Sequence, residues 1–248
     1  MRVVVVGASS GLGRCIAVGM ARRGAHVAVL ARRYDMLTRA AEECGAGTVA
    51  LACDVTDEAS CERAIDEAAD RLSGIDGLVY TPAIGPLKRL IDTDASTWRE
   101  TLDTNVVGAS LVTRAAIGHL KETSGIIAYL SSVSASMTPP WPGLGAYAVS
   151  KAALDKLIEA WRVEHPQVGF TRVVVGDCAG GEGDSMTQFP AAWDWDLAAE
   201  LAPTWSARAY LSGSLMDVEN LVHVVDHVLR CGADASIPSV AVVPRPSG

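Results

Sequence analysis

The start of the chain places a glycine-rich turn between a strand and a helix, and this arrangement restricts the fold more than any other feature. Four valines at 3–6 predict a buried β-strand, and an apolar-periodic helix is predicted over 11–23. Glycines allow a tight turn and a close backbone approach to a pyrophosphate, while the helix N-terminus offers unpaired N–H groups. The glycines are spaced Gly-x-x-x-Gly-x-Gly. The position of the turn predicts a dinucleotide-phosphate site at Gly7, Ser9, Ser10, Gly11, Leu12 and Gly13.

The same strand–helix alternation continues along the chain. Short β-branched runs predict strands at 2–6, 26–31, 48–52, 76–80, 125–130, 169–175 and 238–243. Helical patterns lie near 11–23, 34–44, 57–72, 94–121, 145–164 and 217–230. Continuous apolar strands separated by helices predict an α/β fold: one Rossmann-type, doubly wound parallel sheet of about seven strands with helices on both faces. We expect residues 1–248 to form a single nucleotide-binding domain.

Segment 176–215 is the least regular part of the predicted domain. It is rich in glycine at its start and then contains Trp193, Trp195 and Trp205. An interruption of this length is typical of a functional loop, so we expect a substrate loop or lid. The tryptophans are candidates for an apolar substrate pocket, and they could equally be core or subunit-interface residues.

Composition limits the classes of protein that fit. Of the 248 residues, 49% are hydrophobic and 20% charged, which is typical of a well-buried globular core. The apolar runs are strand-sized and no signal-peptide cleavage pattern precedes the first strand, so we expect a cytoplasmic protein without a membrane partner. Six cysteines without a CxxC pair predict reduced thiols. A net charge of −8 argues weakly against a nucleic-acid partner.

Basic residues gather at the N-terminal end despite the negative net charge. Residues 1–34 contain six arginines and no acid, and we expect Arg22 and Arg23 only to solvate the first helix. Arg32 and Arg33 follow the second strand, where NAD-binding folds place an acid against the adenosine ribose. A guanidinium suits a phosphate instead, so the pair predicts NADP(H) over NAD(H). The alternative is that Arg32 and Arg33 are merely a solvated pair on a loop.

Asp54 follows the third predicted strand, before Val55. A carboxylate at the carboxyl end of a strand can accept a hydrogen bond from an adenine amino group. It could equally cap a helix or close a turn.

A candidate catalytic group lies further along the chain. Tyr147 and Lys151 are four residues apart in a predicted helix, so their side chains share one face. A nearby ammonium stabilises phenolate and would lower the tyrosine pKa into the range of a general acid/base. The fifth strand ends in Ser131-Ser132, and a serine there could polarise a substrate carbonyl or merely cap the loop.

Together these motifs resemble the short-chain dehydrogenase/reductase family. The similarity covers about the first 175 residues: the glycine turn, Asp54-Val55, Asn105, the Ser-Ser strand end and Tyr-x-x-x-Lys, in this order. It implies Ser132, Tyr147 and Lys151 as catalytic residues, with Asn105 supporting a proton-relay water. The resemblance also implies that Tyr147 and Lys151 contact the nicotinamide half of the cofactor, with further cofactor contacts around Val55, Thr81 and Ala83. It implies a small-molecule carbonyl or alcohol as substrate. It further implies a homodimer or a homotetramer.

The chain departs from the family pattern at four places. Val6 stands where the family has threonine, and Tyr80-Thr81-Pro82-Ala83 replaces Asn-Asn-Ala-Gly. Cys178-Ala179 replaces Pro-Gly after the sixth strand. The serine-to-tyrosine spacing favours Ser134, whereas the strand end favours Ser132, and we choose Ser132.

Three alternatives compete with the enzymatic interpretation or add to it. One is a non-catalytic NADP(H)-sensing protein of the same fold. A second is a metal site at His223 and His227, four residues apart beside Asp226, although no third ligand is evident and we expect no metal. The third is a reactive thiol at Cys178, which could equally be a small buried residue.

Overall fold

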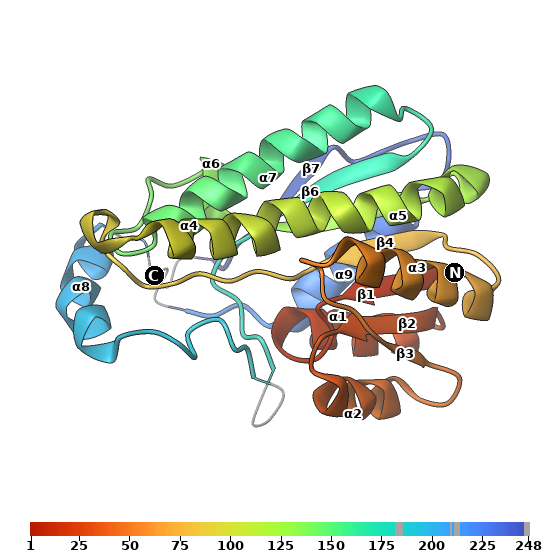
Figure 1. The fold of residues 1–248 in the computed structure, drawn as a ribbon, viewed down its shortest axis with the longest axis horizontal. Helices are drawn as coiled ribbons and strands as arrows, with labels where there is room; N and C mark the ends of the chain where they lie inside the picture. The colour runs from red at the N-terminus through yellow and green to blue at the C-terminus, as the bar shows by residue number, and fades with distance from the viewer. Residues whose placement is uncertain (182–185, 209, 211–213, 246–248) are drawn as a thin grey trace.

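The computed structural model describes residues 1–181, 186–208, 210 and 214–245, and these form a sheet covered by helices on both faces (Figure 1). All seven strands are parallel, in the order β3-β2-β1-β4-β5-β6-β7. The strands are β1 Arg2–Val6, β2 His26–Ala31, β3 Val49–Ala52, β4 Gly77–Tyr80, β5 Ile126–Ser132, β6 Gly169–Val175 and β7 Ser239–Val242. The predicted α/β fold is confirmed, and β5 extends further than expected, to Ser132.

Alternate residues of the strands fill two separate cores, because successive side chains of a strand point to opposite faces. Val3 and Val5 face one core, and Val4 and Val6 face the other. The first core is covered by α1 Gly11–Arg22, α2 Tyr34–Cys44 and α9 Val218–Leu229. The second is covered by α3 Glu58–Leu72, α5 Gly108–Thr123 and α7 Gly145–Glu164.

The helix predicted over 94–121 is divided in the structure. It consists of α4 Ala95–Leu102, a π-helical segment at Asp103–Val107 and then α5. The π-helical segment widens one turn, a feature frequent at functional sites, and it contains the buried Asn105. Periodicity alone did not predict this break, because the apolar pattern continues through it.

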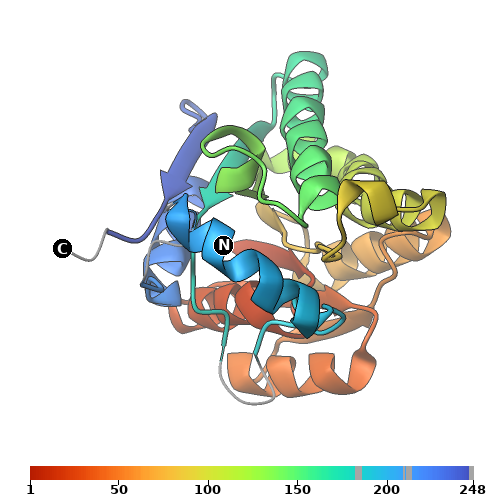
Figure 2. The same ribbon diagram turned by 90° about the vertical axis from the view of Figure 1, so that its left-hand side faces the viewer.

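Segment 176–215 contains a helix that the sequence did not predict. Helix α8, Trp195–Ala207, begins after Asp194, whose carboxylate accepts hydrogen bonds from the backbone N–H groups of residues 196 and 197. Pro203 inside the helix obscured the pattern. Figure 2 shows α8 lying across the carboxyl ends of the strands. Of this segment, residues 182–185, 209 and 211–213 lie outside the described residues.

Two shorter helices complete the described elements, Leu90–Asp92 before α4 and α6 Val133–Ser136 after β5. Among the described residues, no helix combines the length and apolar composition needed to cross a membrane.

Candidate active site

A cavity of about 630 Å³ lies at the carboxyl ends of the strands, where ligands bind in open α/β sheets. Every residue predicted to contact the cofactor lines this cavity. These residues are Gly7, Ser9, Ser10, Gly11, Leu12, Gly13, Arg32, Arg33, Asp54, Val55, Thr81, Ala83, Tyr147 and Lys151. The tertiary structure thus brings the sequence motifs together in one space.

The glycine turn needs its glycines for conformation and for space. Gly7 and Gly11 have φ angles of 84° and 60°, which side-chain-bearing residues rarely adopt. A Cβ atom on Gly7 or Gly13 would overlap the Thr81 hydroxyl. That hydroxyl donates to the Val6 carbonyl at 2.6 Å. Thr81, which departs from the family pattern, therefore packs beneath the turn and fixes it to the end of β1.

Arg33 connects the end of β2 to the same turn. Its Nη2 donates to Ser9 Oγ at 3.0 Å and to Ser10 Oγ at 2.8 Å. Burial, followed by the charge of Arg32, lowers the Arg33 pKa. Two guanidinium groups therefore line the cavity near the phosphate-binding turn, where they could hold an added phosphate.

Other arginines of the N-terminal region bind acidic side chains. Arg2 binds Asp76, and Arg14 binds Glu43 at 2.5 Å. Arg23, expected only to solvate the first helix, instead pairs with Glu219. These contacts lie away from the cavity lining, so the basic bias of residues 1–34 is only partly a property of the site.

Asp54 has local hydrogen-bond partners. Its Oδ1 accepts from the Thr56 backbone N–H at 3.0 Å and from the Thr56 hydroxyl at 2.8 Å. Burial raises the Asp54 pKa, but the bonds from Thr56 and the charge of Arg32 outweigh it, so the net pKa is lowered. Asp54 therefore closes the turn after β3 while it lines the cavity, and its adenine contact stays a prediction.

The serine, tyrosine and lysine meet where β5 ends. Ser132 caps α6, with its Oγ 3.0 Å from Ser134 Oγ. Tyr147 lies in the first turn of α7, where the neighbouring Ser132 hydroxyl acts to lower its pKa, and Lys151 follows one turn later. This effect of Ser132 on the phenol favours Ser132 over Ser134 as the serine that would act with Tyr147.

Lys151 is directed toward the sheet. Its Nζ donates to the Leu130 carbonyl at 2.7 Å and lies 5.8 Å from the centre of the Tyr147 ring. Burial lowers the Lys151 pKa to about 8, and burial raises the Tyr147 pKa to about 12 although the Ser132 hydroxyl acts to lower it. The expected lowering of the Tyr147 pKa is therefore wrong for this arrangement, because burial outweighs an ammonium that binds a carbonyl.

A buried acid beside Lys151 was missed by the sequence analysis. Asp155, one turn further along α7, accepts from Ser131 Oγ at 2.6 Å and from Arg172 Nη1 at 3.0 Å. Burial raises the Asp155 pKa, while Ser131, Arg172 and Lys151 act to lower it. The i, i+4 spacing after Lys151 was the available signal. Arg172, on β6, could be paired with Asp155 only in three dimensions.

Asn105 lies behind the cavity lining. Its Oδ1 accepts from the Ile84 N–H at 2.8 Å, and its Nδ2 donates to the Ile84 carbonyl and to Ser150 Oγ. It therefore joins the loop after β4 to the residue preceding Lys151. A proton-relay water beside it stays a prediction.

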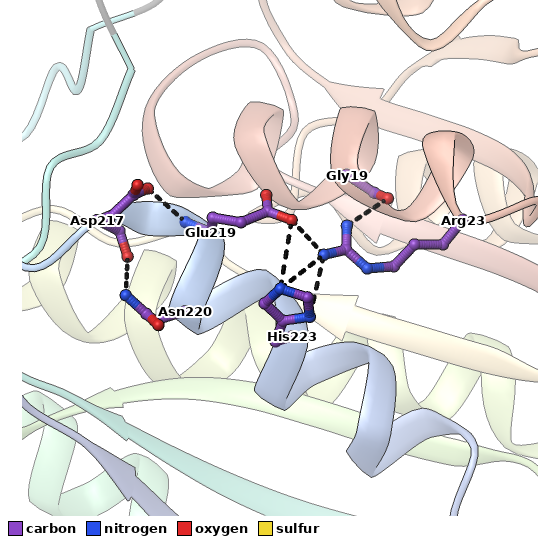
Figure 3. Close-up of polar contacts among 6 residues, drawn as sticks. All are labelled: Gly19, Arg23, Asp217, Glu219, Asn220 and His223. Atoms are coloured by element: carbon purple, nitrogen blue, oxygen red, sulfur yellow. Dashed lines mark hydrogen bonds and ion pairs between the residues drawn. The ribbon is translucent and has the colours of Figure 1, made fainter.

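His223 belongs to a surface cluster between α1 and α9. Figure 3 shows it beside Arg23 and Glu219, with the Arg23 Nη2 at 3.2 Å from His223 Nδ1. No group of three or more metal-ligating side chains occurs among the described residues. The guanidinium occupies the approach to the imidazole, which disfavours the metal alternative.

Cys178 lines the cavity, but its thiol is not activated. Burial raises the Cys178 pKa to about 12, so the thiol is protonated at neutral pH. Its surroundings are those of a small apolar residue.

Comparison with known proteins decides the family. A sequence model described as short chain dehydrogenase matches residues 1–188. The chain belongs to the short-chain dehydrogenase/reductase family. Members of this family are oxidoreductases that use nicotinamide cofactors, in agreement with the cavity described above.

Plant relatives match about 70% of this chain. The chain is 38% identical to 11-beta-hydroxysteroid dehydrogenase-like 4A of Arabidopsis thaliana over 70% of its length, and 36% identical to 11-beta-hydroxysteroid dehydrogenase A of Sesamum indicum over the same share. The matched regions span 60% and 51% of these relatives, respectively.

Solved structures agree over nearly the whole chain. A putative short-chain alcohol dehydrogenase from Sinorhizobium meliloti is 26% identical, with a TM-score of 0.78 over 97% of this chain and 93% of that one. A short-chain type dehydrogenase/reductase from Mycobacterium marinum, 24% identical, has a TM-score of 0.82 over 98% and 93%. The fold thus extends past the part that the family model matches.

Proposed function

We propose that this chain transfers hydride reversibly between NADP(H) and a carbonyl or alcohol substrate, with Tyr147 as general acid/base. The convergence of Ser132, Tyr147 and Lys151 at the end of β5 carries the proposal. These residues line the same cavity as the glycine turn, so a nucleotide on the turn and a substrate at Tyr147 would occupy one space.

Each side chain has a distinct part in the proposed reaction. When bound, the nicotinamide supplies the redox chemistry. Tyr147 donates its proton to the carbonyl oxygen during reduction and accepts one during oxidation. Ser132 donates a hydrogen bond to the same oxygen and holds it near the phenol. Lys151 binds the ribose hydroxyls beside the nicotinamide.

The pKa of Tyr147 fits the role of a proton donor. A phenol with a pKa of about 12 is protonated at neutral pH, as carbonyl reduction requires. The phenolate that remains needs a nearby positive charge. Lys151 can supply it if its ammonium turns from the Leu130 carbonyl toward the Tyr147 oxygen.

Replacement of Tyr147 tests the proposal. In the Tyr147→Phe variant we expect kcat to fall by about 10²- to 10⁴-fold, because the proton donor is lost. The affinity for NADPH, measured by fluorescence titration, should stay within a few-fold of wild type. Full turnover by this variant contradicts the role of Tyr147, and tight NADPH binding without turnover by the wild type favours the sensor alternative.

NADP(H) is proposed over NAD(H) because Arg32 and Arg33 line the cavity where an acid would bind ribose hydroxyls. Loss of a charge-assisted hydrogen bond costs about 1.5–3 kcal/mol, which corresponds to about 10- to 100-fold in affinity. We expect this loss for NADPH in the Arg32→Ala and Arg33→Ala variants, and little change for NADH.

Arg63→Ala is the matched control, since Arg63 is exposed on α3 and does not line the cavity. Both affinities should remain at their wild-type values in this variant. A wild-type preference for NADH overturns the cofactor proposal.

A further inference from the structure

We propose that the substrate is an uncharged ketone or secondary alcohol that carries an aromatic ring. This inference rests on the proposed function and names the substrate class. It is drawn from four aromatic side chains that line the cavity, Trp141, Tyr147, Phe189 and Trp193, which we call the aromatic wall.

The wall begins at the proposed proton donor. The rings of Tyr147 and Phe189 meet edge to face, with centroids 5.0 Å apart at 69°. Phe189 and Trp193 continue the same arrangement at 5.7 Å and 70°. Trp205 lies behind the wall, 6.2 Å from Trp193 and 5.9 Å from Trp141. A substrate whose oxygen reaches Tyr147 therefore has its substituent next to aromatic rings.

The wall is held in place by backbone contacts. Trp193 Nε1 donates to the Gly85 carbonyl at 2.8 Å, and Trp205 Nε1 donates to the Pro142 carbonyl at 2.9 Å. The Phe189 ring lies so close to Gly85 that a Cβ atom there would overlap it. The indole donors of Trp193 and Trp205 are thus used within the protein, whereas Trp141 Nε1 is buried without a hydrogen-bond partner among the described residues. Apart from that N–H and the Tyr147 hydroxyl, the wall offers the substrate apolar ring surfaces.

Apart from Lys151, whose Nζ lies 5.8 Å from the centre of the Tyr147 ring, no charged residue belongs to the segments that carry the wall. Segments 141–147 and 187–193 contain no charged residue. In the described part of the chain, the charged lining residues are Arg32, Arg33, Asp54, Lys151 and Asp177. Three of these follow β2 and β3, where the adenosine half of the nucleotide is expected. Lys151, which donates to the Leu130 carbonyl in this structure, is the residue proposed above to serve the nicotinamide ribose and Tyr147. A substrate carboxylate at the wall would lose water without gaining an oppositely charged partner from the wall segments.

The ring geometry favours a neutral aromatic substituent over a cation. A quaternary ammonium is bound by several ring faces that surround one point. Here successive rings pack edge against face, so they form a continuous surface. A substrate ring can extend this packing by the same edge-to-face or offset contacts, which stabilise aromatic pairs beyond the area they bury.

Matched ketones test the proposal on the wild-type protein with NADPH. The probes are 1-phenyl-2-propanone, 1-cyclohexyl-2-propanone, the para-carboxylate of the phenyl compound and its para-trimethylammonium analogue. The ring is not conjugated with the carbonyl in any of them. We expect kcat/KM for the phenyl probe to exceed that for the cyclohexyl probe about three- to tenfold. Both charged probes should be at least tenfold poorer than the phenyl probe.

Variants of the wall assign the preference to its residues. The Phe189→Leu variant removes the Phe189 ring, and the Gly85→Ala variant displaces it. Both variants should bring the ratio of kcat/KM for the phenyl probe to that for the cyclohexyl probe close to one, while NADPH affinity is retained. Trp161→Leu is the control, since Trp161 stacks on His165 at the end of α7 and does not line the cavity. It should keep the wild-type ratio.

Binding separates this proposal from the proposed function. Dissociation constants of all four probes are measured by quenching of tryptophan fluorescence in the protein–NADP⁺ complex, where no reduction can occur. Equal constants for phenyl and cyclohexyl probes, or tighter binding of a charged probe, overturn the aromatic substrate class. A retained phenyl preference in binding, with no ketone reduced, overturns the proposed function and supports the ring-binding wall.

Discussion

Lys151 shows how burial and partners together set the state of one side chain. The residue is 2% exposed, and its ammonium binds a backbone carbonyl within the protein. Desolvation disfavours the charged form and lowers the pKa from 10.5 to about 8, while the negative charge of Asp155 opposes this effect. At neutral pH the lysine therefore retains the charge that the proposed reaction uses. Keeping this charge buried lowers the free energy of unfolding of the protein.

This cost predicts how stability depends on pH. Between pH 8 and about 10 the unfolded lysine binds more protons than the folded one, so the free energy of unfolding rises with pH in this window. The free energy of unfolding of the wild type, minus that of the Lys151→Met variant, should rise by about 1–2 kcal/mol from pH 8 to pH 9.5 when both are measured by urea unfolding. Above pH 10, ionisation of unfolded Tyr147 opposes the trend because its folded pKa is about 12.

The control is Lys156→Met, at an exposed position on the same helix. Its stability difference from wild type should not change with pH in this window. A constant difference for Lys151→Met as well would show that the charge of Lys151 is not penalised by folding.

Helix α7 is joined to the sheet by polar contacts as well as by apolar packing. Asp155 binds Ser131 on β5 and Arg172 on β6, and Arg172 Nε in turn donates to Ser239 Oγ on β7 at 3.1 Å. Three neighbouring strands are thus connected to the helix that carries Tyr147 and Lys151. The contacts keep this helix in register with the end of β5.

Removal of Arg172 should weaken this connection. In Arg172→Met, Asp155 stays buried with only Ser131 and the Lys151 charge to offset its desolvation. We expect a loss of about 1–3 kcal/mol in the free energy of unfolding, measured with urea. Arg71→Met, which removes an exposed pair with Glu67, should cost less than about 1 kcal/mol. Equal losses in the two variants would mean that the Asp155 contact adds nothing to stability.

At the scale of the whole molecule, the strand order creates the site. The chain builds β1, β2 and β3 toward one edge and then places β4 on the other side of β1. Loops diverge where the order reverses, and the cavity opens at that point. Because strands between residues 2 and 242 form a single sheet, we propose that the chain folds as one domain. Its assembly into a homodimer or homotetramer stays a prediction.

Local patterns determined the strands, most helices and the main motifs that line the cavity. A valine run, a glycine turn and an i, i+4 pair each act within a few residues, so the strands and most helices could be predicted from the sequence. All fourteen cofactor-contact candidates line the cavity, and Val55, Thr81 and Ala83 among them came from the family resemblance and not from a local pattern. The π-helical turn and α8 could not be predicted. The π-helical turn contains Asn105, which binds Ile84 in the loop after β4, and α8 packs Leu201 and Trp205 in one apolar cluster with Leu87 and Leu144. Both sets of contacts join residues far apart in the sequence.

Only the tertiary structure decided which polar and aromatic groups meet. It paired Asp155 with Arg172, turned Lys151 to the Leu130 carbonyl, and set Phe189 against Tyr147. It also reversed the expected direction of the Tyr147 pKa. The physical reason is that burial depends on the whole fold. Spacing along a helix specifies which side chains share a face, but desolvation and long-range partners specify their charge and their neighbours.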